Sequence, residues 1–113
     1  MVEALYVIEF GDVAVAGRPN SGVIVLETNR IFGGDSGFYY LGEYTVKDGT
    51  VTARADIIRH QDGWTSAYGP YNGPFELKMS GRIVGRNIVG TMVHMSNQQR
   101  LRLVLRWKAN LPG

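Results

Sequence analysis

Alternation between apolar and polar residues runs along most of the chain and predicts β-strands. The clearest case lies between residues 37 and 60, where two alternating runs flank the dipeptide Asp48-Gly49. A tight hairpin turn of type I′ needs positive φ at both central residues, and Asp-Gly supplies this at low cost. The pattern therefore predicts a long β-hairpin, entered through a glycine-rich corner at Gly33-Gly34-Asp35.

The same alternation extends over the rest of the chain, and no segment of about ten or more residues shows a helical period. Strands are expected over residues 4–10, 22–28, 31–32, 37–47, 50–60, 73–84, 87–95 and 99–108, with a long loop at residues 61–72. Antiparallel strands joined in chain order are most stable when the sheet closes on itself, because closure removes both unpaired edges. We therefore expect an all-β fold, with residues 1–113 forming a single antiparallel up-and-down β-barrel domain of seven to eight strands, lipocalin-like in type. A flat two-sheet sandwich is the alternative.

The predicted inner face mixes large apolar side chains with glycine and alanine. An eight-stranded barrel is just wide enough to fill with side chains or to hold one small ligand. Small inward residues favour a cavity, whereas a filled barrel would use them to alternate with large ones along its taper. Both interpretations stay open. The candidates for lining a ligand cavity are Phe38, Tyr40, Gly42, Tyr44, Ala53, Ala55, Met79 and Met92.

Several outward positions are apolar although no helix is predicted to cover them. A contiguous set of exposed apolar side chains marks an interaction site. We therefore expect a homodimer packed sheet on sheet. The candidate interface residues are Tyr39, Leu41, Ile58, Val89 and Val93.

The predicted loop at residues 61–72 carries three aromatic side chains, Trp64, Tyr68 and Tyr71, among glycines and a proline. Aromatic residues on loops are typical of binding sites, because they bury a large area at low entropic cost. They are candidates for binding a partner. The same side chains could instead fold over the barrel mouth as a plug or lid, which is the interpretation we favour.

The net charge of the chain is +2, with twelve basic and ten acidic residues. Such a small excess does not indicate nucleic-acid binding unless the charges cluster. One cluster exists, at Arg100, Arg102, Arg106 and Lys108, where the basic residues alternate with leucines and a tryptophan. We interpret it as the solvated outer face of a strand, which also discourages edge aggregation. No nucleic-acid partner is expected.

Catalytic and metal-binding patterns are missing from the sequence. There is no cysteine, no pair of histidines at metal-ligand spacing, no nucleophile elbow and no glycine-rich phosphate loop in a strand-to-helix context. His94 is the one candidate for an inward heme or metal ligand, and a hydrogen-bonded histidine at the barrel end is the alternative. We expect a protein that is not an enzyme and that needs no cofactor. With no signal peptide or membrane span recognisable, we expect it in the cytoplasm.

The corner sequence Ile31-Phe32-Gly33-Gly34-Asp35, followed by Tyr40 and Gly42, resembles the GrlR family, small bacterial negative regulators of type III secretion genes. Weaker similarity continues through residues 80–83, 88–92 and 4–10. The resemblance implies a lipocalin-like, dimeric, non-enzymatic protein that acts by binding a regulatory protein, as one member does when it holds an activator inactive.

One departure from the family lies at the tip of the central hairpin. A well-known member carries a run of acidic residues there, whereas this chain has Val46-Lys47-Asp48-Gly49. The resemblance therefore implies the fold and the dimer, with a changed partner. A carrier or sensor of a small hydrophobic, lipid-like molecule is the alternative function, motivated by the small residues on the inner face.

Overall fold

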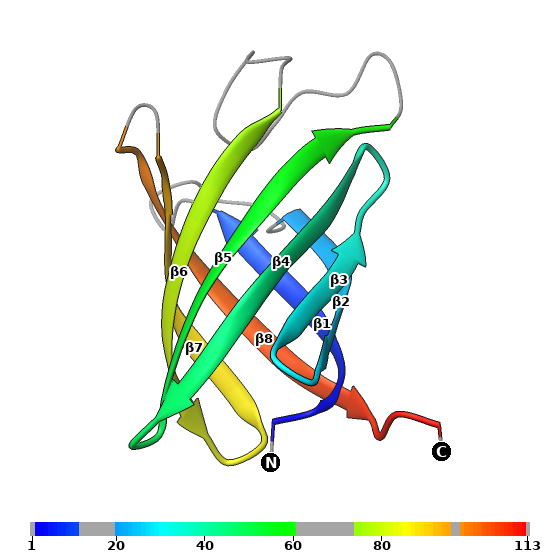
Figure 1. Ribbon diagram of the computed structural model, residues 1–113, viewed down its shortest axis with the longest axis vertical. Coiled ribbons are helices and arrows are strands. Elements are labelled where there is room, and N and C mark those ends of the chain that lie inside the picture. Colours follow the sequence, from blue (N-terminus) through cyan, green and yellow to red (C-terminus); the bar gives the residue numbers. More distant parts are fainter. Residues whose placement is uncertain (1, 12–19, 61–73, 96–97, 113) are drawn as a thin grey trace.

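The computed structural model describes residues 2–11, 20–60, 74–95 and 98–112. These residues form eight strands and no helix (Figure 1). The strands are β1 (Ala4–Gly11), β2 (Asn20–Glu27), β3 (Arg30–Gly34), β4 (Phe38–Lys47), β5 (Thr50–Arg59), β6 (Phe75–Val84), β7 (Asn87–His94) and β8 (Arg100–Ala109). Trp64, Tyr68 and Tyr71, the predicted loop-binding residues, lie outside the described residues.

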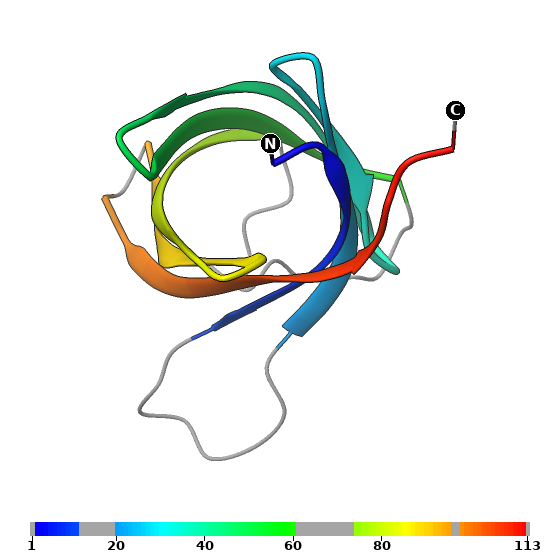
Figure 2. The same ribbon diagram turned by 90° about the horizontal axis from the view of Figure 1, so that it is seen from below.

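The sheet closes into a barrel. Each strand pairs antiparallel with its neighbour in the chain, and β1 pairs antiparallel with β8 (Figure 2). The predicted all-β barrel of seven to eight strands is confirmed, and the flat sandwich is excluded because the first and last strands are hydrogen-bonded to each other. The short strand expected at residues 31–32 is longer in the structure, where β3 spans five residues and pairs with both β2 and β4.

The central hairpin has the turn that its sequence predicts. Asp48 and Gly49 adopt φ values of 53° and 76°, so both central residues have the positive φ of a type I′ turn. All ten residues of β4 pair in register with those of β5. This hairpin forms the wall that faces the viewer in Figure 1.

Alternate residues of every strand point into the barrel, and the apolar ones form a single buried cluster. The burial pattern of β4 and β8 follows the period of two that was read from the sequence. The buried apolar residues are Ala4, Tyr6, Ile8, Ile24, Leu26, Ile31, Phe38, Tyr40, Tyr44, Val51, Ala55, Ile57, Phe75, Leu77, Ile88, Met92, Leu101, Leu103 and Leu105.

Two inward glycines allow neighbouring strands to approach closely. A Cβ atom on Gly42 would lie 1.9 Å from the backbone oxygen of Arg54, and one on Gly90 would lie 1.9 Å from the backbone oxygen of Ser80. The adjacent backbone therefore occupies the place of the missing side chain, a use of glycine that is common where sheets bend tightly. Gly42, interpreted from the sequence as lining a cavity, contributes a bend and no empty space.

Candidate binding surfaces

One pocket inside the barrel has a volume of about 20 Å³. Tyr44, Ala53 and Met79 are the predicted cavity residues that line it, together with apolar residues of β2, β3, β7 and β8. A space of this size holds about one water molecule, whereas small-molecule sites occupy roughly 300–1,000 Å³. This pocket has no room for an acyl chain.

The remaining cavity candidates are members of the packed core. Phe38, Tyr40, Ala55 and Met92 are all buried. The Phe38 ring meets the ring of Phe75 edge to face, with 6.4 Å between centroids. These four side chains thus belong to the buried apolar cluster, and Phe38 packs directly on a neighbour within it.

The corner Gly33-Gly34-Asp35 is built from backbone contacts and one carboxylate. A Cβ on Gly33 would lie 2.3 Å from the backbone oxygen of Val23, so β2 and β3 pack too closely there for a side chain. Asp35 Oδ1 accepts hydrogen bonds from the backbone N–H groups of Gly37 and Phe38, at 2.9 and 2.8 Å. The residues that carry the family resemblance thus stabilise the turn into β4.

Asp35 also binds the hydroxyl group of Tyr40. The Tyr40 hydroxyl donates a hydrogen bond to Asp35 Oδ2. Burial first, then this hydrogen bond and the nearby negative charge, raise the pKa of Tyr40 far above its ordinary value. The Tyr40 hydroxyl is therefore neutral, and it already donates its hydrogen bond to Asp35 in the barrel wall.

His94 faces inward, as predicted, and is 2% exposed. Its ring stacks on Phe75, with centroids 4.6 Å apart and planes 17° apart. No group of three or more His, Cys, Asp or Glu side chains that could hold a metal ion occurs among the described residues. The second histidine, His60, is exposed and lies with Nε2 3.0 Å from the backbone oxygen of Asp35.

An apolar patch covers the outer side of β2 to β5. The register places Phe32 next to Leu41, and Tyr39 next to Ile58. The exposed fractions are 39% for Phe32, 38% for Tyr39 and 47% for Leu41. We call this patch the apolar face; it consists of Val23, Val25, Phe32, Tyr39, Leu41 and Ile58.

The structure separates the predicted interface residues into two groups. Tyr39, Leu41 and Ile58 belong to the apolar face, but Val89 and Val93 lie on β7, which β5 and β6 separate from β4. Figure 2 shows β4 and β5 on one wall and β7 and β8 on the opposite wall. The five candidates thus lie on two walls, because outward direction within a strand does not say which wall the strand occupies; their role in a dimer stays a prediction.

Three members of the apolar face were missed from the sequence. Val23 and Val25 alternate with buried Ile24 and Leu26 on β2, so the alternation of residues 22–28 could have identified them. Phe32 lies on β3, of which only residues 31–32 were expected as a strand. Its outward direction follows from the pairing of β3 with both neighbours.

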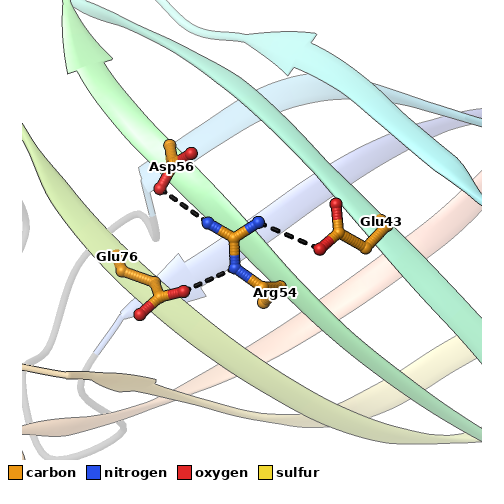
Figure 3. Close-up of polar contacts among 4 residues, drawn as sticks. All are labelled: Glu43, Arg54, Asp56 and Glu76. Carbon is orange, nitrogen blue, oxygen red and sulfur yellow. Dashed lines mark hydrogen bonds and ion pairs between the residues drawn. The ribbon is translucent and has the colours of Figure 1, made fainter.

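Beside the apolar face, Arg54 binds three carboxylates on the outer side of β4, β5 and β6 (Figure 3). Its Nη1 lies 3.0 Å from Glu43, its Nη2 lies 2.8 Å from Asp56, and its Nε lies 2.5 Å from Glu76. Hydrogen bonds to Glu76, Glu43 and Asp56, in that order of effect, raise the pKa of Arg54. Asp56 is directly opposite Leu41 in the register, so this polar network forms one border of the apolar face.

No protein-family model matches the chain, and no curated protein matches its sequence. Across the described ranges no helix is both long and apolar enough to cross a membrane.

Proposed function

We propose that this protein is a non-enzymatic, lipocalin-like regulator that forms a homodimer and acts by binding another protein, in the manner of the GrlR family's negative regulators of type III secretion genes. The observation that carries the proposal is the apolar face on β2 to β5. Contiguous exposed apolar side chains of this kind are typical of protein interfaces. The closed barrel leaves no sheet edge for strand addition, so association is expected to use side chains of the outer faces.

A second copy is the occupant we propose for the apolar face. The adjoining register row carries alternating charges, Glu27, Arg30, Glu43 and Arg54, on four neighbouring strands. In a two-fold symmetric dimer the same patch meets itself, and a row of alternating signs can pair with its own copy after rotation. The apolar side chains would then form the centre of the interface and the charged row its rim.

Substitution of Leu41 tests the dimer. Leu41→Glu places a charge at the centre of the apolar face, and burying it without a partner costs several kcal/mol, so the variant should be a monomer. Val84→Glu is the matched control, because Val84 is 60% exposed and lies outside the apolar face; it should remain a dimer. Light scattering at micromolar concentration distinguishes the two states. A monomeric unmodified protein, or equal effects of both variants, would refute the proposed interface.

The regulatory role rests on the resemblance of the corner sequence, and the 20 Å³ pocket adds no support for a transported ligand. The hairpin tip carries one base and one acid, Lys47 and Asp48, so the partner surface is expected to differ from that of a family member with an acidic tip. The alternative function, a carrier or sensor of a small lipid-like molecule, stays a prediction that a separate measurement can test. Mass spectrometry of the purified protein, first native and then denatured, would reveal a retained lipid-like mass if that hypothesis were correct.

A further inference from the structure

The charges of the chain are strongly separated, although its net charge is only +2. Residues 75–109 contain seven of the twelve basic residues and one of the ten acidic residues. That acid is Glu76, which is already bound to Arg54. The wall formed by β6, β7 and β8 therefore carries a large positive charge, and the remainder of the chain carries a net negative charge.

Four cations on this wall stand in two rows on either side of β7. Lys78 and Arg82 lie on β6, and Arg100 and Arg102 lie on β8; all four are exposed. Neighbouring strands are about 4.8 Å apart, so the two rows are about 10 Å apart. Within the described part of the chain, no ion pair involves any of the four.

The row between the cations is uncharged. In the register, Val93 stands between Lys78 and Arg100, and Val89 stands next to Arg82 and is 44% exposed. We call this surface the cationic face; it consists of Lys78, Arg82, Val89, Thr91, Val93, Arg100 and Arg102. Like charges gathered without counter-charges destabilise the compact state by mutual repulsion, and an acidic partner would relieve that repulsion.

We propose that the cationic face binds an acidic, extended polypeptide segment of a partner protein, with apolar residues alternating with Asp or Glu. The inference rests on the protein-binding role proposed above and names the chemistry of the partner. Carboxylates of the segment would reach the two cationic rows, where arginine forms charge-assisted hydrogen bonds. Apolar side chains would cover Val89 and Val93. Because β7 is paired on both sides, recognition uses side chains and no strand addition.

A nucleic acid fits this surface less well. Its phosphates could contact the arginines, but its sugar–phosphate backbone would leave the exposed Val89 and the half-buried Val93 without apolar contact. Proteins that bind single strands stack bases on exposed aromatic rings. The aromatic side chain on β8 is Trp107, and Arg86 covers it at 4.4 Å from the ring centroid.

Fluorescence anisotropy with a labelled peptide tests the proposal. The probe has the length of β7, 8 residues, and alternates Glu with Leu or Val; in the control peptide Gln replaces Glu. The acidic peptide should bind in low salt, and the Gln peptide should not. Arg102→Glu should weaken binding by about tenfold or more, whereas Lys108→Glu, the same charge change about 20 Å farther along β8, should alter it by less than about twofold.

Four results would overturn the inference. They are no binding of the acidic peptide at micromolar concentration, equal binding of the Gln peptide, equal weakening by both variants, and stronger Arg102-dependent binding of a labelled single-stranded DNA or of phosphatidylserine vesicles. Circular dichroism of each variant checks that the barrel is folded. The dimer is measured separately through Leu41→Glu, so loss of peptide binding with an intact dimer rejects this inference alone, and a monomer that binds the peptide rejects the dimer alone.

Discussion

Replacing Gly42 with alanine is expected to destabilise the barrel far more than a single added methyl group usually does. The new Cβ would lie 1.9 Å from the backbone oxygen of Arg54 and 2.7 Å from the Cα of Ala55, whereas ordinary contact begins at about 3.4 Å. The clashing atoms belong to the backbone of β5, so β4 and β5 must move apart by about 1.5 Å.

Opening the sheet there strains the packing and weakens the adjacent ladder. Overpacking costs about 1–3 kcal/mol, and one or two lost backbone hydrogen bonds add about 1 kcal/mol each. We expect Gly42→Ala to lower the free energy of unfolding by about 2–5 kcal/mol, a large part of the roughly 5–15 kcal/mol typical of a domain. Urea denaturation followed by circular dichroism measures the change.

Two further Gly→Ala variants calibrate this result. A Cβ on Gly11 would meet nothing within 4 Å, so Gly11→Ala should be neutral or slightly stabilising. A Cβ on Gly81 would meet the side chain of Ile88 at 2.8 Å, which can shift, so an intermediate loss is expected. If Gly42→Ala is as stable as Gly11→Ala, the close approach of β4 and β5 is refuted and the cavity interpretation of the inner glycines regains support.

Three more substitutions test the interior and the polar networks. Ala55→Leu should lower stability by about 1–3 kcal/mol, since Ala55 is 1% exposed in a filled core; a rise in melting temperature would contradict this and indicate empty space. Because the pKa of Tyr40 is raised, its contribution is complete below about pH 10 and is lost as pH rises toward the folded-state pKa, so Tyr40→Phe should flatten the loss of stability above pH 10. Arg54→Gln leaves three carboxylates without their cation, so its melting temperature should fall in low salt and largely recover in high salt; a salt-independent loss would refute the electrostatic explanation.

The strands and their inner and outer sides were predictable because both are local properties. A period of two needs only consecutive residues, and Phe38, Tyr40 and Tyr44 are buried as the alternation predicted, although Val46 near the strand end is exposed. The Asp48-Gly49 turn is equally local, since its positive φ values follow from the two residues themselves. The number of strands and their short connections then favoured closure.

The arrangement of the faces depended on tertiary structure. Val89 and Leu41 both point outward, but only the order of strands around the barrel places them on opposite walls. The close approach of β4 and β5 at Gly42 depends on how tightly the closed sheet bends there. Pairing β1 with β8 joins residues about a hundred positions apart, and no local pattern encodes such a contact. Alternation along one strand indicates whether a side chain points inward. The pairing of strands decides which other side chains lie beside that side chain.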